Sequence, residues 1–233
     1  MKSRTPSFLI RVPSAAWVIL LMVSIFTAVS DRYLTPDNIV NIVQQNAVLL
    51  IVALGATLVL LSEGIDLSQG SVLSLSGVTC VYVMKYLMGS GTSNEIAMVA
   101  GVLVGLLTGL VMGTITGGLI AIGKLPSFIA SLGMMGVGGA LALVFADSSA
   151  IYIDNPVYIF FGEKLDRYIH LPLMQYFSMP TFIAAFIFIA VWVILYHTPF
   201  GRYIIAIGGN ESGARLSGVD TSRWKWMVYI ASS

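Results

Sequence analysis

The feature that most constrains the fold is a series of long apolar stretches separated by short polar segments. A bilayer-spanning helix needs about 20 predominantly apolar residues. The six stretches that approach or exceed this length are Pro13–Ser30, Ile39–Leu61, Ser71–Met88, Ile96–Ile122, Phe128–Ala146 and Pro180–Tyr196. A seventh begins at Met227 and reaches the last residue, Ser233. We therefore predict an all-α, polytopic membrane protein with six complete transmembrane helices and the start of a seventh.

Composition supports this prediction. Hydrophobic residues make up 57% of the chain and charged residues 10%, whereas soluble domains carry about 25% charge. A soluble core of this size could not bury so much apolar surface, so the bilayer is the expected solvent. We treat residues 1–233 as a single transmembrane domain. We expect it to be truncated at its C-terminus, because the last apolar run is too short to cross a membrane.

The N-terminal segment admits two interpretations. Lys2, Arg4 and Arg11 precede the first apolar stretch, and residues 28–30 end it with small side chains. This pattern is also typical of a cleaved signal peptide. Because further apolar stretches follow, we favour an uncleaved first transmembrane helix.

Charged residues predict the orientation of the spans. With the N-terminus inside, the inner segments collect eight basic and four acidic residues, against four basic and seven acidic residues outside. Basic residues near the spans favour the cytoplasmic side. We therefore place the N-terminus and residues 200–226 in the cytoplasm, and residues 147–179 outside the membrane.

The fourth stretch carries a glycine at every fourth position. These glycines are Gly101, Gly105, Gly109, Gly113 and Gly117. In lipid, small residues at this spacing let a second helix approach closely. We predict a helix buried in a bundle, with a hinge as the alternative.

Two carboxylates, Glu63 and Asp66, lie at the edge of the hydrophobic zone or within it. Charges at such positions are costly and often functional. One interpretation is structural, with Asp66 or Ser68 capping the third span by accepting bonds from its free amides. The other is a role at an interface with a subunit or partner.

The sequence offers no arrangement typical of an enzyme. Residues 118–124 match G-x-x-x-x-G-K, but Leu125 stands where Ser or Thr should hold magnesium, and the segment ends a membrane helix. His170 and His197 are expected on opposite sides of the membrane, and Cys80 has no nearby partner. No Cys/His cluster has metal-ligand spacing. We predict no catalytic site, no metal and no cofactor bound by this chain.

Residues 200–226 form a basic polar segment that contains signals for a short helix. Asn210 is a favourable N-cap, Glu211 stands in the first turn, where the helix dipole favours an acid, and Gly218 is a natural stop. We predict a helix of about two turns over Glu211–Ser217, with polar linkers on both sides. Because so short a helix is unstable alone in water, it must pack against the bundle or a partner. A solvated loop is the alternative.

Three blocks of sequence carry a resemblance to a known family. They are residues 64–71 (GIDLSQGS), residues 126–135 (PSFIASLGMM), and a third block made of FGRY at 200–203, AIGGNE at 206–211 and ARLSG at 214–218. With these blocks in this order, the whole chain resembles the permease subunit of bacterial ABC importers for simple sugars, of the ribose, xylose and galactose type.

The resemblance implies a bacterial inner-membrane subunit of about ten helices, of which this chain holds the first part. Its implied partners are a cytoplasmic ABC ATPase that binds ATP and Mg, a periplasmic sugar-binding protein, a second permease copy and the lipid bilayer, without nucleic acid. Residues 200–226 would be the cytoplasmic coupling loop and residues 147–179 a periplasmic loop. The residues implied for ATPase coupling are Gly208, Gly209, Asn210, Glu211, Ala214, Arg215 and Gly218. Those of the motif between the second and third spans are Gly64, Asp66, Ser68 and Gly70.

The chain departs from the family pattern in three respects. Gln69 stands where a small apolar residue is usual, and Ser212-Gly213 replaces a pair of alanines. Because Gly lowers helix propensity by roughly 1 kcal/mol relative to Ala, we expect weaker coupling. Since the family's last helices are absent, we expect docking to survive where transport does not.

Two other functions are alternatives to sugar import. A secondary transporter of a small polar solute is the main alternative, and it would need inverted repeats and an ion site at the midplane. A membrane-embedded enzyme would need a His, Asp or Cys cluster. For a neutral sugar, the candidate pathway residues are Gln44, Gln45, Asn46, Ser74, Ser76 and Thr116.

Overall fold

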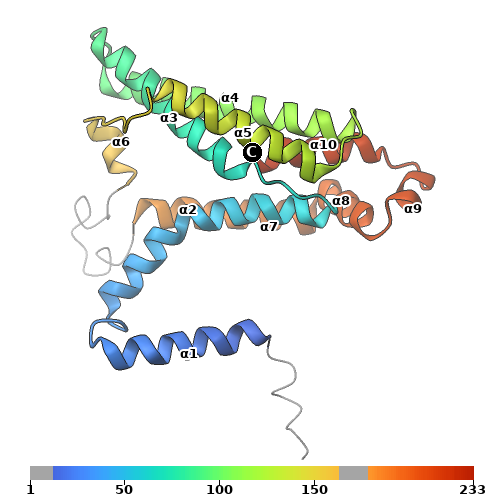
Figure 1. Cartoon of the computed structure of the whole chain (residues 1–233), viewed down its shortest axis with the longest axis horizontal. Helices are drawn as coiled ribbons and strands as arrows, with labels where there is room; N and C mark the ends of the chain where they lie inside the picture. Colours follow the sequence, from blue (N-terminus) through green and yellow to red (C-terminus); the bar gives the residue numbers. More distant parts are fainter. Residues whose placement is uncertain (1–12, 163–177) are drawn as a thin grey trace, which may run out of the picture.

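The computed structural model describes residues 13–162 and 178–233, and this part of the chain is built from α-helices (Figure 1). They are α1 (Ser14–Val29), α2 (Pro36–Leu61), α3 (Gln69–Gly89), α4 (Asn94–Ala121), α5 (Ser127–Phe145), α6 (Pro156–Phe160), α7 (Met179–His197), α8 (Pro199–Gly209), α9 (Glu211–Leu216) and α10 (Thr221–Ser232). The basic residues Lys2, Arg4 and Arg11, His170, and residues 163–177 of the predicted outer loop lie outside the described residues.

Five of the six predicted spans are confirmed as long apolar helices. Helices α2, α3, α4, α5 and α7 contain 26, 21, 28, 19 and 19 residues. The first predicted span is a helix of 16 residues. At 1.5 Å per residue it extends about 24 Å, less than the hydrocarbon thickness of about 30 Å. The chain is a polytopic helical membrane protein.

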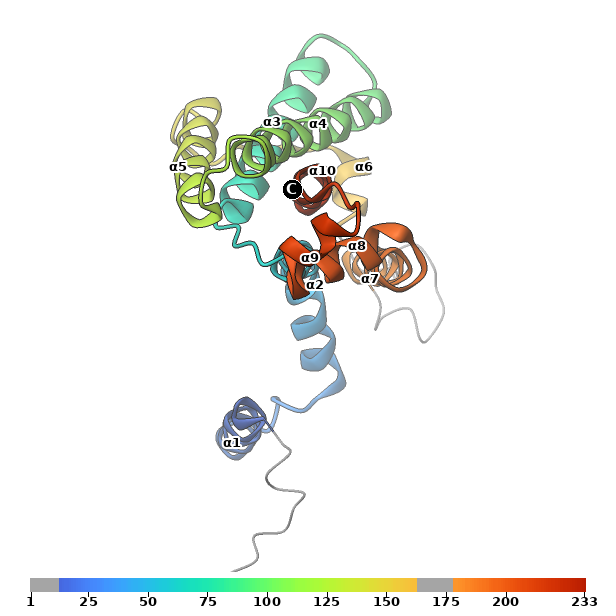
Figure 2. The same ribbon diagram turned by 90° about the vertical axis from the view of Figure 1, so that its right-hand side faces the viewer.

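The helices form two groups that α10 joins. Helices α3, α4 and α5 pack on one another, and α2, α7 and α8 form the second group (Figure 1). Helix α10 lies between the groups, against α4 on one side and against α2 and α8 on the other (Figure 2). Helix α1 stands apart from both groups in both views. The two groups are also connected through the chain between α2 and α3.

The glycine row of α4 is divided between two neighbouring helices. Gly101 and Gly105 face α3, where an added Cβ would lie 2.6 Å from the Cys80 carbonyl oxygen and 3.0 Å from that of Ser76. Both contacts are with backbone, which cannot move aside as a side chain can. This half of the row therefore sets the close packing of α3 on α4.

The other half of the row faces α10. A Cβ at Gly109 would lie 2.6 Å from the Ser233 carbonyl oxygen, and one at Gly113 would lie 2.6 Å from that of Tyr229. At Gly117 the nearest atoms belong to Trp226, at 2.8 Å. The glycines thus allow α10 to enter between the two groups at backbone distance.

The polar linker predicted before α9 was wrong, because that segment is the helix α8, and the linker predicted after α9 is shorter than expected, because it ends at residue 220. In α8, Gly201, Ile204 and Ile207 are buried at helical spacing, although the surrounding glycines and Arg202 make the segment look like a loop. The last helix starts at Thr221 and not at Met227, because the Asp220 carboxylate accepts a hydrogen bond from the Arg223 amide at 3.0 Å.

The predicted outer loop contains a short helix, α6. The Asn155 side chain accepts hydrogen bonds from the amides of Val157 and Tyr158, and it donates one to the Asn94 carbonyl at 3.0 Å. Asn155 thus caps α6 and fixes it to the start of α4.

The α4–α10 contact predicts different outcomes for two glycines on the same helix. Gly113→Ala should destabilise the fold by about 1–3 kcal/mol, because the new methyl group meets backbone of α10. Gly118→Ala is the matched control, since its nearest atom, Trp226 Nε1, lies 3.9 Å away. Thermal unfolding of the chain in detergent measures both, and equal midpoints would contradict the packing described.

Candidate coupling site

The first two sequence blocks meet at one end of the molecule, although about 60 residues separate them. The Ile65 amide donates a hydrogen bond to Ser127 Oγ at 3.2 Å. Ser131 Oγ donates to the Ile65 carbonyl at 3.3 Å. These bonds join the turn before α3 to the first turn of α5.

The third block joins the same end through α8 and α10. Gly208 packs directly on the Leu61 carbonyl at the end of α2, where no side chain would fit. Ile204 belongs to a core cluster with Leu58, Val59, Val228 and Tyr229. All three blocks therefore surround one region next to α9, the helix at the right edge of Figure 1.

The short helix predicted from the sequence is confirmed as α9. Asn210 Oδ1 accepts a hydrogen bond from the Gly213 amide at 2.8 Å, and Gly218 has φ +86° just after the helix ends. Ala214 faces inward, whereas Gly209 faces open space. At Gly213 a Cβ would lie 3.2 Å from the Asn210 side chain, so the glycine leaves room for the cap.

Glu211 fixes α9 to α10. Its carboxylate accepts a hydrogen bond from Lys225 Nζ at 2.5 Å and pairs with Arg215 at 3.3 Å. The same guanidinium donates to Thr221 Oγ1 at 3.3 Å. The hydrogen bond from Lys225 is the main reason that the pKa of Glu211 is lowered, with the positive charge of Arg215 adding a smaller effect and burial opposing both.

The direction in which the pKa of Glu211 is shifted determines the pH range over which its ion pairs stabilise the fold. Because the pKa of Glu211 is lower in the folded chain, its ion pairs contribute stability above the usual glutamate pKa of about 4.3. That contribution is lost as the pH falls through the lowered pKa of the folded state. The link between α9 and α10 is therefore intact across the neutral range.

The motif between α2 and α3 forms its own turn. Asp66 Oδ1 accepts hydrogen bonds from the amide and the hydroxyl of Ser68, at 2.8 and 2.6 Å. Ser68 is the N-cap residue of α3, but its side chain makes no capping bond. The predicted cap is thus corrected: Asp66 holds the N-cap residue and not the helical amides. Gly70 has open space around its Cβ position.

Gly64 has a different role in this turn. A Cβ there would lie 2.5 Å from the Tyr229 hydroxyl and 2.9 Å from Val59. Glycine at this position therefore lets the Tyr229 side chain of α10 reach the turn before α3.

A polar cavity of about 320 Å³ lies behind α9. Its charged lining residues are Glu63, Lys124, Glu211, Arg215 and Lys225. Glu63 and Lys124 occupy the turns before α3 and α5, both in the left-handed backbone region, with φ of 59° and 58°. Residues held there without glycine cluster at functional sites.

The outer surface of this region carries an apolar side chain that sequence reasoning missed. Leu216, the last residue of α9, is 90% exposed. Arg202, Arg215 and Arg223 are exposed on the helices α8, α9 and α10. Arginine is enriched in protein–protein contact surfaces, so this end of the molecule is a candidate docking surface.

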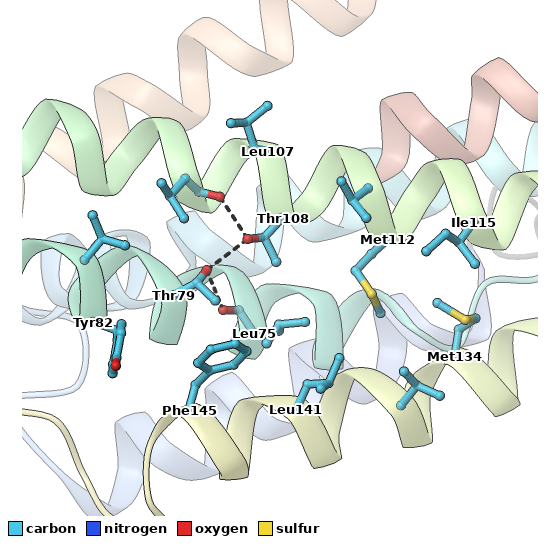
Figure 3. A pocket seen from close by; sticks show the side chains of 14 residues that line it. Leu75, Thr79, Tyr82, Leu107, Thr108, Met112, Ile115, Met134, Leu141 and Phe145 are labelled. Carbon is cyan, nitrogen blue, oxygen red and sulfur yellow. Dashed lines mark hydrogen bonds between the residues drawn. The ribbon is translucent and has the colours of Figure 1, made fainter.

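A second cavity, of about 640 Å³, lies between α3, α4 and α5 and has a different character (Figure 3). Its lining is apolar except for three residues that carry hydroxyl groups, Thr79, Tyr82 and Thr108. The two threonine hydroxyls bond to each other at 3.0 Å and to carbonyls of their own helices. Both threonines are therefore already satisfied, and the cavity has little with which to recognise a sugar hydroxyl.

The candidate pathway residues lie apart from both of these cavities. Gln44 donates to the Gly162 carbonyl, and Asn46 and Thr116 donate to carbonyls of their own helices. Ser76 Oγ is buried without a hydrogen-bond partner among the described residues. Ser74 lines another cavity, of about 380 Å³, between α3, the segment that follows α5, and α6. These side chains do not converge on one site.

Sequence patterns gave no signal for the long-range contacts of this region. Lys225 lies 14 residues after Glu211, beyond any spacing within one helix. Tyr229 stands in a short apolar run, where a core position is the default expectation. The exposure of Leu216 follows only from how α9 lies on the bundle.

The contact between Gly64 and Tyr229 predicts a rescue. Gly64→Ala should destabilise the fold, because its methyl group overlaps the Tyr229 hydroxyl. Adding Tyr229→Phe removes the closest atom and should restore about half of the lost stability. The two variants and their combination are compared by thermal unfolding in detergent. Additive effects would show that the two residues do not contact each other.

Comparison with known proteins places this geometry in a family. A family model described as branched-chain amino acid transport system / permease component matches residues 38–233. The ribose import permease protein of Escherichia coli (strain K12) is 35% identical over 213 residues, which cover 91% of this chain and 62% of that protein. No solved structure matches the chain.

Two further relatives show similar coverage. The ribose import permease protein of Bacillus subtilis (strain 168) is 36% identical, over 91% of this chain and 61% of that protein. The D-allose transport system permease protein of Escherichia coli (strain K12) is 32% identical, over 93% and 62%. The chain thus spans about 62% of the length of these relatives. Because the family match runs from residue 38 to residue 233, the chain belongs to the family of branched-chain amino acid transport system / permease components.

Proposed function

We propose that this chain is part of the transmembrane subunit of an ATP-driven importer that carries a simple sugar across the bacterial inner membrane. The observation that carries the proposal is the convergence of three sequence blocks on α9, a capped helix with an exposed leucine. Relatives named as ribose and D-allose permeases support the sugar class. The distribution of basic residues supports an orientation in which the N-terminus and α9 face the cytoplasm and residues 147–179 face the periplasm.

In the proposed mechanism, ATP binding and hydrolysis occur with Mg on a separate ATPase that contacts α9. Movement of α9 is passed through the Glu211–Lys225 ion pair to α10. Because α10 contacts α4 on one side and α2 and α8 on the other, its displacement shifts the two helix groups relative to each other. A second permease copy and a periplasmic sugar-binding protein complete the assembly.

Leu216 is expected to anchor the ATPase. Leu216→Ser should weaken binding of the ATPase subunit about 30-fold, because burying a leucine side chain contributes about 2 kcal/mol. Tyr152→Ser is the matched control, since Tyr152 is 86% exposed and comes shortly before α6 in the sequence, and α6 and α9 lie at opposite ends of the molecule (Figure 1). Titration of labelled ATPase against the reconstituted permease measures both. Equal affinities of the two variants would remove Leu216 from the interface.

The Glu211–Lys225 pair is expected to carry the coupling. Glu211→Lys should reduce the ATP hydrolysis that loaded binding protein stimulates in reconstituted complexes about tenfold, because like charges then separate α9 from α10. Combining it with Lys225→Glu restores the pair in reverse and should recover most of the stimulation. Unchanged stimulation in Glu211→Lys would refute coupling through this contact.

A further inference from the structure

The helices α8, α9 and α10 form one structured surface at the end of the molecule that carries α9. The Tyr203 ring of α8 packs on the Trp224 ring of α10, with centroids 4.8 Å apart. Phe200 packs on the same tryptophan, with centroids 5.9 Å apart. The ion pair between Glu211 and Lys225 fastens α9 to α10. Exposed side chains on these helices therefore stand on a rigid junction and not on a flexible loop.

This surface carries an excess of positive charge. The charged side chains between residues 199 and 226 are Arg202, Glu211, Arg215, Asp220, Arg223 and Lys225. Four basic and two acidic groups give a net charge of +2 at neutral pH. Glu211 already pairs with Lys225 and Arg215. The Asp220 carboxylate accepts the Arg223 amide as the cap of α10.

Two of the arginines carry charge that no ion pair balances. Arg202 on α8 and Arg223 on α10 are exposed, and within residues 13–162 and 178–233 neither forms an ion pair. Arg202 directly precedes Tyr203, and Arg223 directly precedes Trp224, so both flank the aromatic contact between the two helices. A guanidinium can donate two parallel hydrogen bonds to one carboxylate. These two arginines are therefore available to pair with acidic groups of a partner.

The position of α9 favours a protein over the bilayer as that partner. Figure 1 shows α9 beyond the ends of α2 and α7, along the direction in which these spans run. Leu216 of α9 is 90% exposed there, where water and not hydrocarbon is the expected solvent. Anionic lipid headgroups would neutralise the arginines but would leave this leucine in water. A protein surface can cover the apolar side chain as well, which is favourable.

We propose that the partner of this surface presents carboxylates to Arg202 and Arg223 beside an apolar pocket for Leu216. The inference rests on the proposed function, in which the partner is the ATPase subunit, and it adds the chemistry of the partner's surface. Charges at the edge of an interface act chiefly on the rate of association. The arginines therefore speed the encounter, whereas Leu216 slows dissociation of the complex.

The test is the rate at which labelled ATPase subunit associates with the reconstituted permease, measured by stopped flow at increasing salt concentration. We expect the rate for the wild type to fall as salt rises, because ions screen the attraction. Arg202→Glu combined with Arg223→Glu should lower the rate at low salt about tenfold, because the new carboxylates repel those of the partner. Arg202→Lys combined with Arg223→Lys keeps the charge and should retain the fast association.

The matched control is Arg32→Glu combined with Lys85→Glu, which changes the net charge by the same amount. Both residues are exposed. Arg32 precedes α2 and Lys85 lies near the end of α3, and these ends of α2 and α3 lie at the opposite end of the molecule from α9 (Figure 1). This variant should associate as the wild type does.

The lipid composition of the vesicles separates a protein partner from the bilayer. The effect of the charge-reversed arginines should be the same in vesicles of phosphatidylcholine alone and in vesicles that also contain phosphatidylglycerol. An effect confined to phosphatidylglycerol vesicles would show that the arginines bind headgroups and would overturn the proposal.

Equal association rates of the wild type and of Arg202→Glu with Arg223→Glu at low salt would also overturn the proposal. If Leu216→Ser still weakens binding in that case, docking at α9 stands and only the acidic partner surface is wrong. If the ATPase subunit binds neither the wild type nor any variant, the proposed function fails together with this inference.

Discussion

The structure depends on the close approach of α10 to the glycine row of α4. At Gly109, Gly113 and Gly117 no side chain of α4 separates it from the last residues of the chain, so backbone meets backbone at these positions. In lipid, where apolar side chains gain little by leaving the solvent, such contacts hold helices together by packing. Since α10 also contacts α2 and α8, this approach joins the two helix groups.

The same helix connects the bundle to α9. Near its start, Lys225 binds Glu211 of α9. One residue later, Trp226 Nε1 donates to the Thr114 carbonyl of α4 at 3.0 Å. Further along, Tyr229 reaches the turn at Gly64. A single helix of 12 residues, α10, thus contacts α9, α4 and the turn before α3. We therefore expect a displacement of α9 to displace the bundle as well.

Local sequence signals predicted the local structure well. Apolar stretches predicted the long spans, the spacing of glycines in α4 predicted a closely packed helix, and Asn210 with Gly218 predicted the bounds of α9 within one residue. Local signals failed where packing decided the outcome. The sequence around Ile204 looked like a polar linker, because glycines and arginines hide a buried face that recurs at helical spacing. The contacts of Lys225 and Tyr229 join distant segments, so no periodicity could predict them.

The most direct test of this account is amide hydrogen exchange in Thr221–Ser232, measured in the reconstituted permease with and without the ATPase subunit bound. Transmission through α10 predicts that binding at α9 changes exchange along α10 and along the facing part of α4, and that Glu211→Lys abolishes the change beyond α9. A change of exchange that stays within α9, with α10 unaffected, would contradict the account.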